Sequence, residues 1–194
     1  MLVQNVIDIA ASPVLLSGAS LDGMNFAQSY FKESNVLVVL KGRRDEFSNL
    51  GDLKNNPNFI IGNLGYFSLI SKRYFHYARS VEIQDFMHIS HALDEGIIDA
   101  MYWGKSQAIA YCTKNPEYVV IDYGESIGHS YLAFPVKFDA FAFIFFLNSW
   151  IKQLEGEGFN KKQYDYWMLG HPPDTKKNRW SLLKEISRKR NSSL

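Results

Sequence analysis

The chain has 194 residues, of which 46% are hydrophobic and 21% charged, a composition typical of a globular protein that buries a core. Its most apolar run, 140–147, is far shorter than the ~20 residues that cross a bilayer, and the single Cys112 excludes an intrachain disulfide. Seven Lys and Arg against two acidic residues make 171–194 basic, which is typical of a solvated tail, whereas the body offers no basic stripe for nucleic acid.

Short apolar runs alternate along the chain with segments of helix length. The apolar runs predict strands at 13–17, 35–40, 58–62, 80–83, 97–103, 118–123 and 130–136. Apolar positions three or four residues apart predict helices at 65–77, 84–95, 105–115, 138–155 and 161–169. Strands alternating with helices predict an α/β fold.

Two short patterns have catalytic or metal-binding readings. Residues 124–128, GESIG, match the G-x-S-x-G elbow of serine hydrolases, but the sequence after them predicts a strand rather than the helix that an elbow requires. A glycine-permitted loop is the preferred interpretation. His88 and His91 lie three apart on a predicted helix and could hold a metal, yet too few further ligands accompany them. We therefore predict neither a catalytic residue nor a metal site.

The loop at 62–67, GNLGYF, follows a predicted strand and precedes a predicted helix. Backbone N–H groups at a helix start have no partner within the helix and favour an anionic group. Open α/β sheets also place their ligands at the carboxyl ends of strands. This loop is therefore a candidate ligand site, although a plain strand–helix turn would read the same way.

Several segments, taken in order, resemble one known family. These are FSNLGDLKNNPNFIIGNLGYFSLISKRYF, ALDEGIIDAMYW, YLAFPV and FLNSWIKQLEGEGFNKKQYDYWMLG, with LLSGAS and FAQSYFKESNVLVVL upstream. They resemble the type II periplasmic solute-binding proteins of bacterial solute-binding family 3. The ending YWMLG and the stretch RRDEF are similar, more narrowly, to binding domains fused to cation:dicarboxylate symporters.

The resemblance implies an α/β, periplasmic-binding-protein-like type II fold with two lobes and a ligand cleft between them. It assigns Asp99 a structural role and implies no cofactor. The ligand-binding positions that it implies are Ser17, Gly18, Asn63, Leu64, Gly65, Tyr66, Phe67, Tyr102, Trp103 and Gly104. The aromatic members of this set are expected to converge on one concavity.

Two charged groups that amino-acid-binding members usually carry are absent. Residues 21–25 lack the arginine that clamps the ligand carboxylate, and Gly104 stands where an aspartate usually pairs with the ligand ammonium. We therefore expect ordinary amino acids to bind weakly.

The first lobe is expected to be incomplete, since the sequence begins after two strand–helix units of the family pattern. This predicts four parts: 1–46, a remnant of lobe 1 and the crossing to lobe 2; 47–123, lobe 2; 124–170, a return crossing and C-terminal helices packing on lobe 1; and 171–194, a basic tail. The strands PVLLS and NVLVVL should then leave an unpaired edge, and the helix FDAFAFIFFLNSW should be uncovered, which invites self-association.

The predicted function is capture of a small organic solute, amino-acid-like or a carboxylate, for a membrane transporter. A fused or adjacent symporter is one candidate for that transporter. The alternatives are an enzyme on the same scaffold, similar to cyclohexadienyl dehydratase with Asp122 or Glu125 as general acid, and a sensory or vestigial binding domain. The resemblance implies a periplasmic or membrane-associated location, although residues 1–12 do not form a signal peptide.

Overall fold

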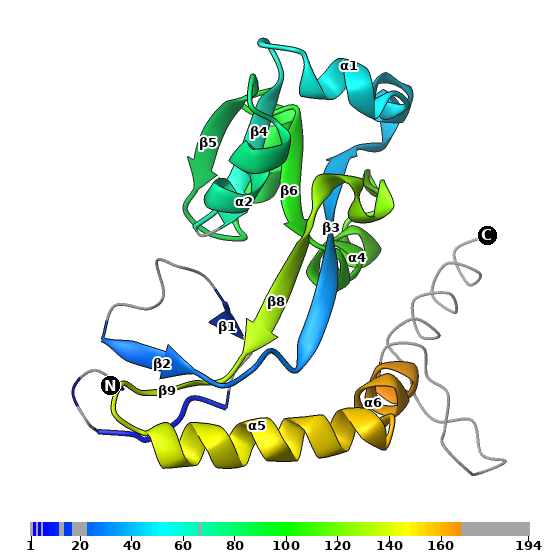
Figure 1. Cartoon of the computed structure of the whole chain (residues 1–194). Helices are drawn as coiled ribbons and strands as arrows, with labels where there is room; N and C mark the ends of the chain where they lie inside the picture. Colours follow the sequence, from blue (N-terminus) through cyan, green and yellow to red (C-terminus); the bar gives the residue numbers. More distant parts are fainter. Residues whose placement is uncertain are drawn as a thin grey trace, which may run out of the picture. The chain divides into compact units, whose positions relative to one another are not determined.

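The computed structural model describes residues 2, 4, 6–11, 14–16, 23–65 and 67–167 (Figure 1). The chain forms two compact units. Unit 1 comprises residues 1–14, 23–31 and 133–194, and unit 2 comprises residues 15–22 and 32–132. The candidate ligand positions at 63–67 and 102–104 therefore belong to unit 2.

Unit 2 is built on a sheet in which parallel and antiparallel strands mix. The strands run in the order β1 (Val14–Leu15), β8 (His129–Ala133), β3 (Phe31–Leu40), β6 (Ala100–Gly104), β4 (Ile60–Leu64) and β5 (Arg79–Ile83), with β7 (Tyr118–Ile121) also pairing with β3. Strands β5, β4 and β6 are parallel to one another, whereas β3 is antiparallel to β6 and to β7.

The sequence of β3 explains its central place. Val36, Leu37, Val38 and Val39 are all fully buried, so both faces of the strand are covered. A continuous apolar run of this kind is typical of a strand with layers on both sides. The beginning of the strand is different, because two buried polar residues, Glu33 and Asn35, precede the apolar run. They indicate a polar environment at that end of β3.

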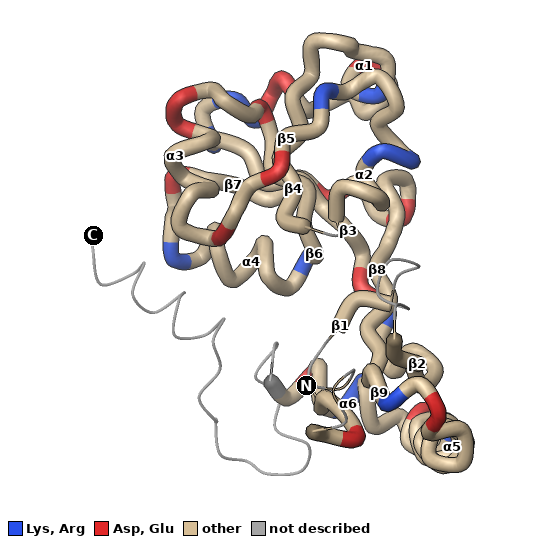
Figure 2. Tube along the Cα trace, turned by 90° about the vertical axis from the view of Figure 1, so that its left-hand side faces the viewer, with Lys and Arg blue, Asp and Glu red and all other residues tan. Residues whose placement is uncertain are grey.

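Helices cover this sheet. Helix α2 (Phe67–Tyr74) packs on β4, β5 and β6, and α3 (His88–Asp94) packs on β5 and β6. Helix α4 (Lys105–Lys114) contacts β6 and β7. The remaining elements are the 3-10 segments η2 (Lys41–Phe47) and η3 (Gly124–Ile127) and the short helix α1 (Leu50–Lys54). Figure 2 shows Lys and Arg interspersed with Asp and Glu over unit 2.

Unit 1 has a smaller sheet and two helices. Strand β2 (Met24–Phe26) pairs antiparallel with β9 (Pro135–Lys137), and Ile9 bridges to Val136. Helix α5 (Phe141–Gly156) buries Leu147 and Ile151 against this sheet and contacts α6 (Phe159–Trp167). The amide of Asn148 ties α5 to the segment after β2, because its Oδ1 accepts the backbone N–H of Gln28 at 2.6 Å.

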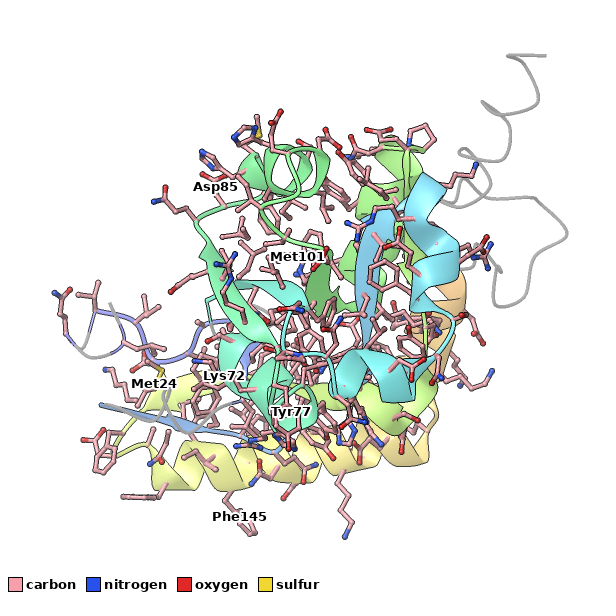
Figure 3. The ribbon with its side chains drawn as sticks, turned by 90° about the horizontal axis from the view of Figure 1, so that it is seen from above. Met24, Lys72, Tyr77, Asp85, Met101 and Phe145 are labelled. Carbon is pink, nitrogen blue, oxygen red and sulfur yellow. The ribbon has the colours of Figure 1, made fainter. Side chains whose placement is uncertain are left out.

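The outer face of α5 is also apolar. Four large aromatic side chains of α5 are exposed: Phe141, Phe145, Phe146 and Trp150. Phe138, which precedes the helix, is exposed as well. Phe145 is 76% exposed and projects outward from the helix (Figure 3). The expectation of an uncovered apolar helix is therefore confirmed. In the part of the chain that is described, no helix combines the length and apolarity that crossing a membrane requires.

The expectation of an unpaired edge at NVLVVL is wrong. Strand β3 pairs with β6 on one side and with β7 and β8 on the other, so none of its buried apolar run lies at an edge. The neighbours come from residues later in the chain, because β7, η3 and β8 run back along β3. The predicted strand 130–136 is in fact two strands, β8 and β9, which belong to different sheets.

Candidate functional site

The carboxyl ends of β4 and β6 lie side by side at one edge of the unit 2 sheet. The two strands are parallel neighbours, with Asn63 opposite Tyr102, and each leads into a helix, α2 after β4 and α4 after β6. The first residues of β3 reach the same edge, because Asn35 is opposite Gly104 in the antiparallel pairing. The fold therefore brings together the two segments of candidate residues, which are about 40 positions apart in sequence.

Asn63 carries an unused hydrogen-bonding atom at this edge. The side chain is fully buried, and its Nδ2 donates to Ser80 Oγ at 3.1 Å and to the Ile61 carbonyl at 3.3 Å. Its Oδ1 has no partner among the described residues. Buried polar atoms are nearly always paired, so an unpaired one calls for a partner that the described residues do not supply.

Gly65 lets a ligand come close to the backbone, because it has no side chain in the way. It has φ +45°, and a Cβ built on it would meet nothing within 4 Å. The space above Gly65 is therefore open, and it lies directly before α2, where backbone N–H groups favour an anion. Leu64 is partly buried in the same turn.

The three aromatic candidates that the structure describes do not line one concavity, contrary to the expectation for them. Phe67, Tyr102 and Trp103 all belong to the core of unit 2. Phe67 meets Tyr102 edge to face, with ring centroids 6.1 Å apart, whereas Trp103 stacks on Phe86 at 5.3 Å. Successive strand residues point to opposite faces, so Tyr102 and Trp103 cannot face the same space. The backbone positions 102–104 remain candidate ligand contacts.

Tyr102 instead forms part of a buried polar network. Its hydroxyl accepts a hydrogen bond from Asn35 Nδ2 at 2.7 Å and donates one to the Ile127 carbonyl at 2.7 Å. Ser130 Oγ donates to Asn35 Oδ1 at 2.8 Å. Burial raises the pKa of Tyr102, so the hydroxyl keeps its proton. This network fastens β3, β6 and β8 together beneath the edge of the sheet.

Glu33 places a carboxylate where Gly104 has no side chain. Its Oε1 accepts the backbone N–H of Ser106, at the start of α4, at 2.6 Å. A Cβ built on Gly104 would lie 2.6 Å from Glu33 Oε2. Sequence reasoning missed this residue because it considered position 104 alone. The signal that could have found it is an acidic residue at the start of a strand that is otherwise apolar.

Asp99 has the structural role that the resemblance implies. Its Oδ2 accepts the backbone N–H of Ile60 at 2.8 Å, and its Oδ1 accepts Arg43 Nη2 at 3.0 Å. Arg43 also pairs with Glu46 at 2.8 Å. The carboxylate thus holds the start of β4 and the segment after β3, at the opposite end of β6 from Gly104.

The remaining candidates have no site geometry to support them. Ser17, Gly18 and Tyr66 lie outside the described residues. The GESIG segment is η3 followed by strand β8, not a strand–helix elbow. His88 Nδ1 contacts Asp85 Oδ1 at 2.7 Å, and the described residues contain no group of three or more metal-ligating side chains.

Comparison with known proteins gives structural matches only. Neither a family profile nor a curated protein matches the sequence. An ancestral amino-acid-binding protein, a precursor of cyclohexadienyl dehydratase, is 22% identical, with a TM-score of 0.65 over 86% of this chain and 71% of its own. An amino acid ABC transporter substrate-binding protein from Streptococcus pneumoniae, bound to L-arginine, is 18% identical, with a TM-score of 0.64 over 81% and 66%.

The GluR0 ligand-binding core in complex with L-glutamate is 18% identical, with a TM-score of 0.65 over 79% of this chain and 68% of its own. Identities this low show a shared fold. The fold class expected from the sequence is confirmed: the chain has the periplasmic-binding-protein type II fold, shared with proteins that bind amino acids.

Proposed function

We propose that the chain is a solute-binding domain that captures a small organic solute, amino-acid-like or a carboxylate. The observation that carries the proposal is the edge of unit 2 where β4 and β6 end together. There the open space over Gly65, the unpaired Asn63 Oδ1 and the starts of two helices lie within one small region. Backbone N–H groups at a helix start would bind a carboxylate without any arginine.

Binding would work by closure of the two units on the solute. The chain passes between the units four times, after residues 14, 22, 31 and 132, so a few backbone positions could absorb a hinge motion. The solute would favour the closed state by the contacts that exist only there. Ser17 and Gly18, which lie outside the described residues, stay predicted ligand contacts within this proposal.

The partner in this proposal is a membrane transporter, either an ABC transporter or a symporter that is fused or adjacent, and the location is the periplasm. The support is the similarity to proteins described as amino-acid-binding and as a transporter's substrate-binding protein. A sensory or vestigial domain is the alternative within the same class. If the protein binds a solute, the domain is not vestigial.

A binding role fits the acidic residues better than an enzymatic one. A general acid needs a pKa near or above neutrality. A hydrogen bond from Lys105 lowers the pKa of Asp122, and one from Lys32 lowers the pKa of Glu125. Both candidate acids of the dehydratase alternative are therefore ionised and have no proton to donate.

We also propose that the outer face of α5 mediates self-association. A helix that is apolar on all sides is normally covered on all sides. Here the buried side packs on the sheet of unit 1, while five large aromatic side chains near or on the opposite side are exposed. Sedimentation velocity should show a concentration-dependent oligomer that Phe145→Glu reduces to a monomer. A monomeric wild-type chain would refute this proposal.

The test of solute binding uses two glycines that share a backbone conformation. Gly65 and Gly96 have φ +45° and +65°, and a Cβ on either would meet nothing within 4 Å. Asn tolerates this region, so Gly65→Asn and Gly96→Asn should fold equally well. Only Gly65 lies at the proposed site, since Gly96 follows α3 at the opposite end of β6.

A thermal-shift screen of amino acids, organic acids and amines should find a solute that stabilises the wild type. At 100 times the dissociation constant, binding adds about 2.7 kcal/mol of stability. Gly65→Asn should lose most of this gain, and Gly96→Asn should keep it. Equal gains in both variants would rule out the site, and no stabilising solute would rule out the function.

A further inference from the structure

We propose that Glu33 binds a cationic group of the solute, a primary ammonium or a guanidinium. This inference rests on the solute-binding function proposed above and assigns its solute class: a molecule that carries a positive charge. The argument begins with where the carboxylate lies. Glu33 is the third residue of β3, and its side chain stands at the same edge of the sheet as Gly104.

The Glu33 carboxylate is nearly buried, and one of its two oxygens accepts a hydrogen bond from the chain. Glu33 is 9% exposed. Its Oε1 accepts the Ser106 N–H at 2.6 Å, whereas the described residues show no hydrogen bond to Oε2. A carboxylate can accept up to four hydrogen bonds, so this nearly buried one can accept further donors.

Two lysines close to this position pair with other carboxylates. Lys32, next to Glu33 in sequence, pairs with Glu125, and Lys105, which follows Gly104, has its Nζ 2.7 Å from Asp122 Oδ2. The described ion pairs do not include Glu33. The start of α4 offers partial compensation, worth a fraction of a full charge. A nearly buried carboxylate of this kind favours a cation that arrives with a ligand.

The polar groups around Glu33 do not compete for its free oxygen. Asn35, Ser130 and the Tyr102 hydroxyl bond to one another and to the Ile127 carbonyl. These hydrogen bonds connect β3, β6 and β8 to one another. This leaves Glu33 Oε2 as a charged acceptor near Gly104, where the neutral Gln107 Oε1 is a second acceptor, 3.5 Å from a Cβ built on Gly104.

Gly104 is what makes this position available. A Cβ there would lie 2.6 Å from Oε2 and 3.3 Å from Cδ of Glu33. Any side chain at 104 would therefore displace the carboxylate, and the glycine and the glutamate form a pair. The chain thus offers an acidic contact through β3 even though residue 104 has no side chain.

The same edge also suits the opposite charge. The turn at Gly65 presents the start of α2 to an anionic group, and Glu33 presents a carboxylate beside the start of α4. A zwitterion or an amine would satisfy Glu33, whereas a simple carboxylic acid would place its charge near Glu33 without compensation. Amine-bearing solutes should therefore bind in preference to their deaminated analogues.

The experiment compares solutes that differ only in the ammonium group. The probes are the twenty standard amino acids, putrescine, and deaminated analogues such as 3-phenylpropanoate for phenylalanine. Binding is measured by thermal shift and then by calorimetry. The variants are Glu33→Gln, which keeps an oxygen for the Ser106 N–H, and Glu125→Gln, a matched change at a carboxylate whose side chain is 71% exposed.

Glu33→Gln should weaken binding of the best amine-bearing probe by about 10- to 100-fold, as expected for loss of a hydrogen bond to a charged group. Glu125→Gln should leave it unchanged. Gly104→Ala, which displaces the carboxylate, should weaken binding in the same direction as Glu33→Gln. A melting curve for each variant establishes that it is folded.

The outcomes separate this inference from the function on which it rests. If amine-free carboxylates bind as tightly as the amines, and Glu33→Gln changes neither, solute binding stands and the role of Glu33 is refuted. If no probe of either kind binds, both fail. Selective loss of the amine-bearing probes in Glu33→Gln alone supports the assignment.

Discussion

Replacing Tyr102 by Phe tests whether the buried polar network stabilises unit 2. The change removes one oxygen and keeps the ring, so the contacts with Phe67 and Phe75 remain. It leaves Asn35 Nδ2 and the Ile127 carbonyl without the partner they now have, both at 2.7 Å. A buried polar group that loses its partner costs about 1–3 kcal/mol. The two groups together should therefore cost about 2–6 kcal/mol.

The measurement is urea unfolding followed by circular dichroism. Tyr77→Phe is the matched control, since Tyr77 is 62% exposed, and it should change stability by less than about 0.5 kcal/mol. Asn35→Ala combined with Tyr102→Phe should cost less than the sum of the single changes, because both remove the same hydrogen bond. A loss under about 0.5 kcal/mol for Tyr102→Phe, or strict additivity, would refute the reasoning.

Three further changes test other parts of unit 2. Gly128→Ala should destabilise by about 3 kcal/mol in a thermal melt, because Gly128 has φ +91° and a Cβ would overlap the Tyr74 ring; an unchanged melt would contradict this. Asp99→Ala should cost about 2–3 kcal/mol in urea, since two donors lose a charged acceptor, and a near-wild-type midpoint would argue against it. Asp122 has a pKa lowered by Lys105, so its stabilisation is present above the unfolded pKa of about 3.9 and is lost as pH falls through the folded pKa. Asp122→Asn should therefore cost up to ~1 kcal/mol at pH 7 and progressively less as pH falls below the unfolded pKa, and a cost that does not change with pH would refute the linkage.

The sequence predicted most elements of unit 2 because each of these has a local signal. Helix α4 occupies Lys105–Lys114 against a prediction of 105–115, and its end before Pro116 needs no tertiary information. Strand β7 and helix α2 likewise follow from their apolar spacing. The short strand β2 and helix α1 were missed, since three and five residues give too few positions for a period to show.

The pairing of strands could not be predicted in the same way. Strand β3 was expected at an open edge because its neighbours were sought upstream, whereas they come from β6, β7 and β8 downstream. Long-range pairing depends on how the whole chain returns, which local patterns do not report.

The residues of the candidate site also divide into those with a local sequence signal and those placed by long-range pairing. Asn63, Gly65 and Gly104 were found from their place at strand ends, a local feature. Glu33 was not, because it reaches the site from a strand that begins some 70 residues earlier than α4. The aromatic residues were assigned to a surface by their type, but in strands near the centre of a sheet large aromatic side chains mostly fill the core.

The chain enters and leaves the main segment of unit 2 through two neighbouring strands, so this segment can be exchanged as one piece. The main segment of this unit, residues 32–132, begins in β3 and ends in β8, and these are neighbouring strands. An inserted segment whose two ends lie side by side can be replaced by another of different length or sequence with little disturbance of its host. Residues 32–132 can thus be treated as a cassette that can be exchanged as one piece.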